Sequence, residues 1–222
     1  MKPNRYFKLL GTLKELMLLH EQVDDIQLMA MMEKGEPIIA YEFEAAYSEE
    51  CKMSVLLDIR ASRKDDSYFL NKYEATLQYS GSSDKNRRYT FHILDRTAIT
   101  SVEAFNLLDG RAVYKQFIDD YGKKYNGWMQ FDFANRDLDG QYKLMKTGLY
   151  YTFDLETALS HYNIQELENA REKDNLLRCL LRGDLYPVNI ITGKTIRLMH
   201  IRANPFHKII SLRAPFSNSR KN

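Results

Sequence analysis

The sequence predicts an α+β protein made of repeated units, each a helix, a glycine and a β-hairpin, with antiparallel sheets packed on the helices. Similar segments around Gly110 and Gly183 join a short helical run to alternating strands, and a weaker copy surrounds Gly35. Elsewhere apolar and polar residues alternate with a period of two, which is typical of strands with one buried face. The 15 tyrosines and 11 phenylalanines also favour strands over a purely helical fold.

The two clearest copies of the unit are residues 106–114 and 179–187, and the weaker third copy begins at Met31. In each copy the glycine follows the helical run, where a residue with positive φ commonly ends a helix. Because helix–Gly–strand connections are frequent, independent convergence is the alternative to a true repeat. An architecture of repeated units favours a protein that recognises other molecules through its exterior over an enzyme with a single deep catalytic pocket.

The first 98 residues are expected to form a helical segment followed by a β-meander. Residues 5–34 carry apolar side chains three and four apart, which predicts one helix or two. Four runs with a period of two then predict antiparallel strands with one buried face. These runs are 37–45, 53–59, 73–79 and 89–93, with a polar hairpin loop at 81–86 before the last of them.

Residues 99–165 are expected to form the central unit. Thr100 and Glu103 have the spacing of a capping box, in which each side chain bonds the backbone N–H of the other residue, so they predict the start of a helix. The helix should end at Gly110. Strands are expected at 113–118, at 125–133 and from Tyr142, with a turn at 137–140 and a short helix at 154–159.

Residues 166–214 are expected to form the C-terminal unit, and a polar, basic tail follows at 215–222. A helix should run from about Leu167 to Arg182 and stop at the next residue, Gly183. Two strands should pair across the turn at 192–194, and a third strand at 208–213 should follow the Asn204-Pro205 turn.

The charge is unevenly distributed along the chain. No Asp or Glu follows Asp184, and the last 38 residues carry a formal +7, which leaves −5 on the first 184 residues out of the total of +2. Phosphate binding requires clustered cations, so four residues are candidates for nucleic-acid contact: Arg197, Arg202, Lys208 and Arg213. The alternative is that these cations decorate a sheet edge that faces solvent or a partner, because edge strands commonly carry Lys and Arg.

No catalytic motif is recognised in the sequence, so no catalytic residue is assigned. Phosphate-binding glycine loops, the Gly-x-Ser-x-Gly elbow and His-Glu-x-x-His are absent from it. His200 and His207 flank one turn, but no carboxylate follows Asp184 to complete a metal site nearby. No metal and no cofactor are therefore expected. The acidic residues within 137–139 are better explained by turn chemistry than as a catalytic pair.

Two aromatic residues are candidates for a protein interface. Trp128 alternates with polar residues in its predicted strand, so its side chain is expected to be partly exposed, and exposed Trp residues often anchor interfaces. A Trp packed under a helix is the alternative. Phe206 lies beside the basic residues of the C-terminal strands, where an aromatic ring can also stack on a nucleobase.

The expected compartment is the cytoplasm, with no membrane partner. No apolar run is long enough to cross a bilayer, and no small-residue cleavage site follows the basic N-terminus. Cys51 and Cys179 stand far apart without disulfide or metal spacing, so both are expected to be reduced thiols in the core.

Four segments of the chain resemble an uncharacterised family of proteins from Bacteroidetes mobile elements. They are residues 105–113, 127–133, 151–159 and 203–210, and the resemblance covers roughly residues 35–214. Related short repeats occur in conjugative-transposon proteins, some of them attached to DNA topoisomerases. The resemblance implies a DNA-mobility or accessory context but carries no established activity and no catalytic residues. This chain departs from the family pattern in its more basic ending and in the short hairpin at 190–193.

The preferred hypothesis is a non-enzymatic accessory or adaptor protein of a mobile genetic element that binds a protein partner. The first alternative is a nucleic-acid-binding module that uses the basic C-terminal sheet. The second alternative is an enzyme whose site the sequence does not reveal. The oligomeric state and the identity of the partner are not predicted.

Overall fold

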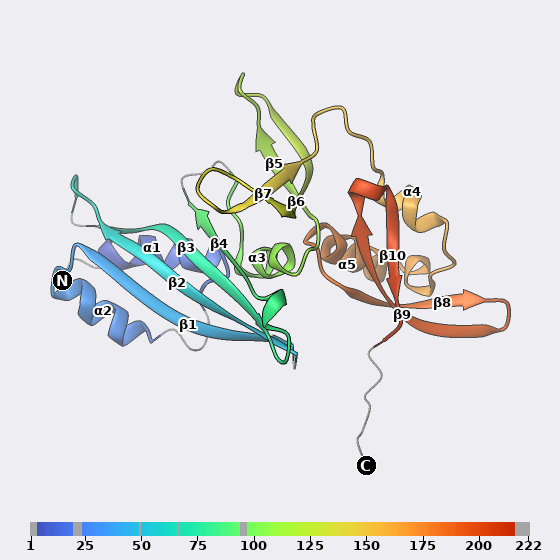
Figure 1. Ribbon diagram of the computed structural model, residues 1–222, viewed down its shortest axis with the longest axis horizontal. Coiled ribbons are helices and arrows are strands. Elements are labelled where there is room, and N and C mark those ends of the chain that lie inside the picture. Colours follow the sequence, from blue (N-terminus) through green and yellow to red (C-terminus); the bar gives the residue numbers. More distant parts are fainter. Residues whose placement is uncertain (1–3, 20–23, 49, 66, 94–96, 216–222) are drawn as a thin grey trace, which may run out of the picture. The chain divides into compact units, whose positions relative to one another are not determined.

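The computed structural model describes residues 4–19, 24–48, 50–65, 67–93 and 97–215, and it contains both helices and antiparallel sheets (Figure 1). The α+β class predicted from the sequence is confirmed. By its contacts the chain divides into two compact units. Unit 1 comprises Met1–Asp109 and Asp132–Lys143, and unit 2 comprises Gly110–Phe131 and Leu144–Asn222.

Unit 1 contains the predicted meander, a four-stranded antiparallel sheet with the strand order β1-β2-β3-β4. Its strands are β1 (Ile38–Ser48), β2 (Cys51–Ala61), β3 (Tyr68–Tyr79) and β4 (Arg87–His92), with a 3-10 turn at Ser83–Lys85 in the last hairpin. One face of the sheet is buried, as the alternation predicts. Its buried side chains include Ile39, Tyr41, Phe43, Met53, Val55, Leu57, Ile59, Tyr73, Ala75, Leu77 and Phe91.

Two helices occupy the predicted N-terminal helical segment, α1 (Asn4–Glu15) and α2 (Asp25–Glu33). The apolar stripe of α1 is buried, with Leu9 and Leu13 almost completely inaccessible, and this helix contacts β3. The side chain of Asp24 accepts the N–H groups of Ile26 and Gln27 and so caps the start of α2.

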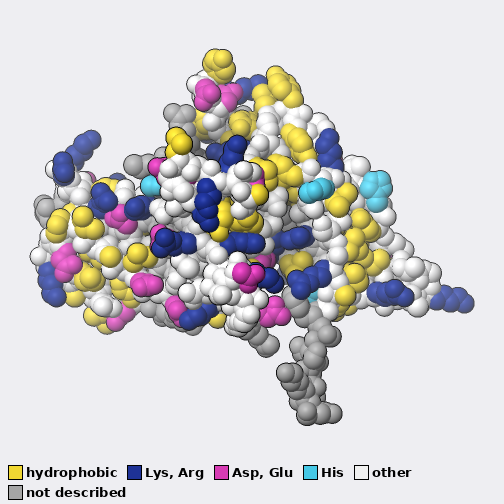
Figure 2. All heavy atoms as spheres, viewed as in Figure 1, with side chains coloured by type: hydrophobic (Ala, Val, Ile, Leu, Met, Phe, Trp, Pro, Cys, Tyr) yellow, Lys and Arg dark blue, Asp and Glu magenta, His cyan; other side chains and the backbone are white. Residues whose placement is uncertain are grey.

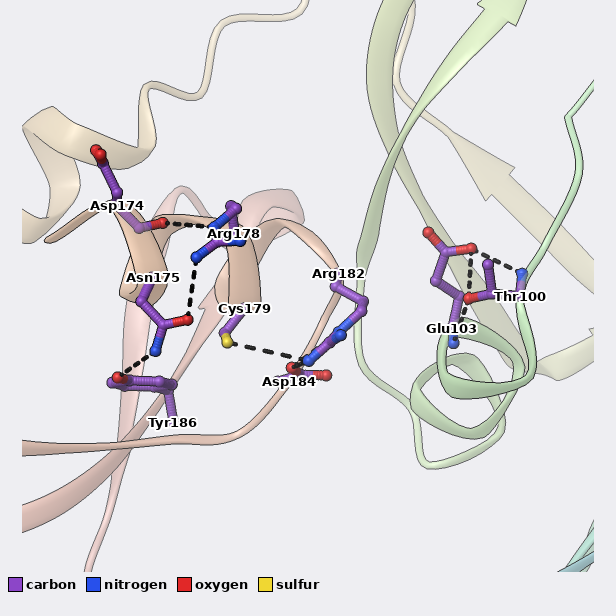
Figure 3. A network of polar contacts seen from close by, with 9 residues as sticks. All are labelled: Thr100, Glu103, Asp174, Asn175, Arg178, Cys179, Arg182, Asp184 and Tyr186. Atoms are coloured by element: carbon purple, nitrogen blue, oxygen red, sulfur yellow. Dashed lines mark hydrogen bonds and ion pairs between the residues drawn. The ribbon is translucent and has the colours of Figure 1, made fainter. Parts of the chain in front are cut away.

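Helix α3 (Ser101–Leu108) begins where the sequence predicts. The Thr100 side chain accepts the N–H of Glu103, and the Glu103 carboxylate accepts the N–H of Thr100 at 2.8 Å (Figure 3). The predicted capping box is confirmed. It satisfies two backbone donors that the first helical turn would otherwise leave without partners.

The other face of the four-stranded sheet is mainly polar and balanced in charge, although Ile38, Leu56 and Phe69 are exposed on it. Lys52 bonds Glu44 at 2.9 Å across neighbouring strands, and Arg60 bonds Asp58 at 3.0 Å within β2. Such exposed pairs contribute little to stability. This face is therefore a solvated surface of the kind that antiparallel sheets commonly carry.

A second antiparallel sheet has the order β5-β6-β7, and β6 and β7 contribute residues to both units. Its strands are β5 (Val113–Ile118), β6 (Lys124–Arg136) and β7 (Tyr142–Lys146). In the turn before β7, the Asp137 side chain accepts the N–H groups of Asp139 and Gln141. This geometry supports turn chemistry as the explanation for these acidic residues.

The rest of unit 2 joins helices to a third antiparallel sheet, of order β10-β9-β8. Its elements are α4 (Leu155–Ser160), a 3-10 turn (Gln165–Glu168), α5 (Ala170–Leu181), β8 (Tyr186–Thr192), β9 (Thr195–Asn204), a 3-10 turn (Pro205–His207) and β10 (Ile209–Arg213). Leu176 and Leu180 of α5 pack with Val188 and Ile201 of the sheet in one core. The predicted order of helix and strands is confirmed.

Trp128 belongs to this core, so the prediction of a partly exposed interface side chain is wrong. Its side chain is 2% exposed, and its ring lies 5.1 Å from that of Tyr114 and 5.8 Å from that of Phe153. The alternation of the strand misleads here because Gly127, Trp128 and Met129 are buried one after another, which means that both faces of β6 are covered at this point.

Three helices are followed by a glycine in the left-handed region, with φ of 74° at Gly35, 80° at Gly110 and 89° at Gly183. Each glycine stands three residues before the next strand, which begins at Ile38, Val113 or Tyr186. Glycine suits these corners because it has no Cβ to clash when φ is positive.

The two units differ from the three-part division expected from the sequence, with boundaries after residues 98 and 165. Helix α3 falls in unit 1, although the sequence suggests a boundary just before it. Helix α4 falls in unit 2 together with the C-terminal sheet. Of the predicted tail at 215–222, residues 216–222 lie outside the described residues.

Candidate functional site

The C-terminal sheet turns one face toward the core of unit 2 and leaves the other open. Residues directly opposite in an antiparallel pair share a face, and alternate residues of a strand share a face. Ile201 lies opposite Tyr186 and Leu212, and Ala203 lies opposite Ile210, so these positions mark the core side. We call the other side the open face. It comprises Pro187, Asn189, Ile191, Ile196, Leu198, His200, Arg202, Asn204, Ile209, Ser211 and Arg213.

Aliphatic side chains occupy much of the open face in an exposed state. The exposed fraction is 61% for Ile196, 50% for Leu198 and 49% for Ile209. Figure 2 shows hydrophobic side chains gathered over β9 and β10, with Lys and Arg side chains beside them. Single exposed aliphatic residues are ordinary, but several on one sheet face are typical of an interaction surface.

Two of the four predicted nucleic-acid residues share this face. Arg202 lies opposite Ser211, and Arg213 lies opposite His200, so the two arginines are diagonal neighbours on adjacent strands. The distance along β9 from Ile196 to Arg202 is six residues, or about 20 Å at the usual rise of a strand. The open face thus has Ile196 and Leu198 near the β8–β9 turn. The two arginines lie toward its other end, where Ile209 stands opposite Asn204.

The other two predicted residues lie elsewhere. Arg197 is opposite Ile190 and therefore on the core side of the sheet, at its exposed end. Lys208 occupies the left-handed turn before β10, with φ of 55°, and its Nζ lies 5.2 Å from the centre of the Tyr151 ring. The four cations therefore do not form one continuous stripe.

The strands β8, β9 and β10 contain no acidic residue, so the electrostatics of the open face are cationic. An acid from outside these strands contacts the sheet at β8: the Glu166 carboxylate accepts the backbone N–H and the side-chain amide of Asn189, each at 3.0 Å. That carboxylate is held at the β8 edge, where Ile164 also forms a bridge to Ile190.

Both edges of the C-terminal sheet have contacts. The backbone N–H of Ile191 donates to Asn163 at 2.9 Å beside β8, and the Tyr162 hydroxyl donates to the Ile210 carbonyl at 3.3 Å beside β10. These contacts engage part of each edge, so the side chains of the open face are the larger surface that this sheet offers for recognition.

Phe206, the remaining interface candidate, is half-buried and packs against the core of unit 2. Its ring lies 6.5 Å from that of Tyr151, whose hydroxyl donates to the Pro205 carbonyl at 2.5 Å. Phe206 therefore has a structural role at the start of β10. A role in partner binding stays a prediction.

A polar network joins α5 to the start of β8 (Figure 3). The Asn175 amide donates to the Tyr186 hydroxyl at 2.9 Å, and Arg182 forms an ion pair with Asp184. Burial raises the pKa of the Cys179 thiol, and the Asp184 carboxylate raises it further. Since the thiolate is the nucleophilic form, this arrangement disfavours a reactive cysteine.

The sequence predicts that both cysteines are reduced thiols in the core, and the structure places only Cys51 there. Cys51 and Cys179 are both free thiols, Cys51 fully buried and Cys179 only in part. His207 contacts the Asn204 side chain at 2.9 Å. Among the described residues, no group of three or more His, Cys, Asp or Glu is close enough to hold a metal ion.

Each unit also has a shallow, open hollow. The one in unit 1, of about 390 Å³, lies between the end of α1 and the start of α3 and includes Lys14, Tyr47 and Ser101. The one in unit 2, of about 360 Å³, is bordered by Glu156 and Lys173, which form an ion pair at 2.5 Å. The Ser101 hydroxyl donates to the Met17 carbonyl at 2.6 Å and the Ser160 hydroxyl to the Thr157 carbonyl at 2.8 Å, so neither serine is hydrogen-bonded to a base as an activated nucleophile is.

The aliphatic part of the open face is what sequence reasoning missed. Its signal is present in β9, where Ile196 and Leu198 alternate with Met199 and Ile201, so that both faces of one strand are apolar. A strand covered on one side only should carry polar residues on the other. The excess of aliphatic residues therefore indicated that the open side of β9 carries an apolar surface.

No family model, no curated protein and no solved structure matches the chain. The resemblance to mobile-element proteins therefore stays a prediction. No helix within the described residues has the length and apolar character needed to cross a membrane.

Proposed function

We propose that this chain is a non-enzymatic accessory or adaptor protein that binds a protein partner through the open face of its C-terminal sheet. The observation that carries the proposal is the exposure of Ile196, Leu198 and Ile209 beside Arg202 and Arg213. The partner has an apolar patch that covers Ile196 and Leu198, with carboxylates that meet the two arginines further along the face. The cytoplasm and a mobile genetic element are the context that the composition and the family resemblance favour.

The physical basis is burial of the aliphatic side chains. Full burial of such a side chain is worth about 1.5–3 kcal/mol, and roughly half of each is still exposed, so each contributes about 1 kcal/mol on binding. The two arginines add specificity, because a guanidinium binds a carboxylate through two parallel hydrogen bonds. Residues of this kind at an interface often account for most of the binding energy.

The test is capture of the bound protein from nuclease-treated host extract with a double variant, Ile196→Ser with Leu198→Ser. Leu56→Ser is the matched control, because Leu56 is an exposed leucine, 39% accessible, on the solvated face of the sheet in unit 1. The partner should be lost with the double variant and kept with the control. Equal capture by all three proteins would refute the proposal.

Nucleic acid is the second candidate, favoured by the arginine pair Arg202 and Arg213 on a surface without acids. It predicts a salt-dependent affinity for a short labelled duplex or single strand. Changing both arginines to alanine should abolish that binding, whereas the Ile196 and Leu198 substitutions should leave it unchanged. The opposite pattern, or no binding at low salt, would exclude this candidate.

We also infer that the segments around Gly35, Gly110 and Gly183 are copies of one folding unit. The equal spacing from each glycine to the next strand supports this inference. In copies of one unit these glycines have the same role, so Gly110→Ala and Gly183→Ala should each lower the free energy of unfolding by at least about 1 kcal/mol. A variant at either position with unchanged stability would contradict it.

A further inference from the structure

An adaptor needs a second surface, and unit 1 offers one along the free edge of β1. This strand is 11 residues long and stands at the end of the order β1-β2-β3-β4. The N–H of Ala61 donates to the Pro37 carbonyl at 3.0 Å, and residues 37 and 61 continue the β1–β2 register. They therefore occupy a hydrogen-bonded position of the ladder.

This position decides which backbone groups are free. In an antiparallel ladder, hydrogen-bonded and non-hydrogen-bonded pairs alternate. Ile39, Tyr41 and Phe43 therefore bond to β2, whereas the intervening residues direct their N–H and C=O groups outward. The outward set consists of Ile38, Ala40, Glu42 and Glu44. Within the described part of the chain, no backbone group bonds to this set from outside the sheet.

Only part of the usual protection of an edge strand is present here. Edges are commonly blocked by charged side chains, especially lysine, and by proline, short length or a bulge in the strand. The charges at this edge are the carboxylates of Glu42 and Glu44. Between Ala40 and Glu44 there is no lysine and no proline, and the register shift of β1 lies beyond them, at Ala46–Ser48. A strand of this kind is a ready template for another chain.

The charge of the edge selects the partner. Residues 35–51 contain five glutamates and no Lys, Arg or His. Glu44 pairs with Lys52, but Glu42 has no ion-pair partner among the described residues. A second copy of the chain would bring these glutamates against each other in a symmetric pair, and like charges across strands are destabilising.

We propose that the edge of β1 binds an extended segment of a partner protein that carries Lys or Arg at alternate positions. The segment adds a fifth strand to the sheet through the outward backbone groups, and its cations face Glu42 and Glu44. This surface lies in unit 1 and is independent of the open face in unit 2.

The probe for the test is a capped synthetic peptide of alternating lysine and valine, with a matched peptide in which glutamate replaces lysine. Amide exchange is followed by NMR in the whole protein. Without peptide, the amides of Ala40, Glu42 and Glu44 should exchange quickly, and those of Ile39 and Phe43 slowly. The lysine peptide should slow amide exchange at Ala40, Glu42 and Glu44, whereas the glutamate peptide should leave their exchange rates unchanged.

Ala40→Pro removes one outward N–H donor and leaves the hydrogen bonds between β1 and β2 in place. It should therefore lower the affinity for the lysine peptide at least tenfold. Slow exchange at Ile39 and Phe43 in this variant shows that the sheet is intact. If it is not, the double variant Glu42→Lys with Glu44→Lys serves instead, and it should switch preference to the glutamate peptide.

Four outcomes would overturn the proposal. They are protection of Ala40, Glu42 and Glu44 before peptide is added, no binding of the lysine peptide, and equal binding of both peptides. The fourth is a dimer of the chain that Ala40→Pro dissociates, which would assign the edge to a second copy.

Discussion

Replacing Gly127 with alanine should destabilise unit 2 strongly, because β6 has no room for a methyl group at this position. A Cβ there would lie 2.8 Å from Thr147 Oγ1, 3.2 Å from the Thr147 carbonyl oxygen and 3.3 Å from the Phe117 ring. Thr147 cannot move away from an added methyl group, because two hydrogen bonds to Trp128 hold it in place. Its Oγ1 accepts the Trp128 N–H at 2.8 Å, and its own N–H donates to the Trp128 carbonyl at 2.9 Å.

The expected loss follows from these contacts. Forcing a methyl group into a packed interior costs about 1–3 kcal/mol. Displacing Thr147 Oγ1 would also leave the buried Trp128 N–H without its acceptor, which costs about 1–3 kcal/mol. A total loss of about 2–6 kcal/mol is therefore expected.

Urea unfolding followed by tryptophan fluorescence measures this directly, because Trp128 is the single tryptophan and adjoins the substitution. Gly148→Ala is the matched control, since a Cβ at Gly148 meets no atom within 4 Å. The control should change stability by less than about 0.5 kcal/mol. In a Thr147→Ala background the loss from Gly127→Ala should shrink. Equal stability of the Gly127 and Gly148 variants would refute the close approach of these residues.

Three further predictions concern strain, pH and thiol reactivity. Met17 is a non-glycine residue with φ of 53° at the end of α1, so its backbone is strained. Met17→Gly should therefore raise the free energy of unfolding, measured in urea, by about 1 kcal/mol. A lower free energy of unfolding in the variant would show that no such strain is relieved. Burial raises the pKa of Tyr73 and Tyr79, so the folded state keeps protons that unfolded tyrosines lose above about pH 10. The stabilising effect of the two tyrosines on the free energy of unfolding should therefore be fully present below about pH 10 and decrease above it. Tyr79→Phe should make this decrease with pH less steep. An unchanged pH dependence in the variant would count against the explanation. Finally, Cys179 should react with iodoacetamide more slowly than free cysteine, and Asp184→Asn should speed the reaction, because the carboxylate raises the pKa of the thiol. Labelling at the same rate in both proteins would show that the carboxylate has no such effect.

Local patterns in the sequence predicted most of the elements. The period-two runs placed Ile39, Tyr41 and Phe43 on one face, and the structure buries all three. The capping box of Thr100 and Glu103 also forms as predicted. These features depend on residues that are neighbours in the chain, whose side-chain directions follow from the backbone geometry of a helix or strand.

The same local patterns misplaced Trp128 and left the candidate site incomplete. Alternation indicates that two faces of a strand differ, but it does not say what covers each of them. Trp128 is buried because both sides of β6 are covered, and Arg197 is separated from Arg202 because the core of unit 2 occupies only one side of β9. The position of each cation on a face was readable from its spacing. Which face stayed open was not.

The sequence by itself determined the order of helices and strands, the glycine corners and the cationic character of the last strands, because each of these rests on short-range conformational preference or on composition. Only the tertiary structure decided that the open face carries exposed aliphatic residues, that no strand among the described residues pairs with the outer edge of β1, and that the chain divides after residues 109, 131 and 143. Those properties depend on which surfaces far apart in the chain are buried together, and burial is a consequence of packing that no local pattern contains.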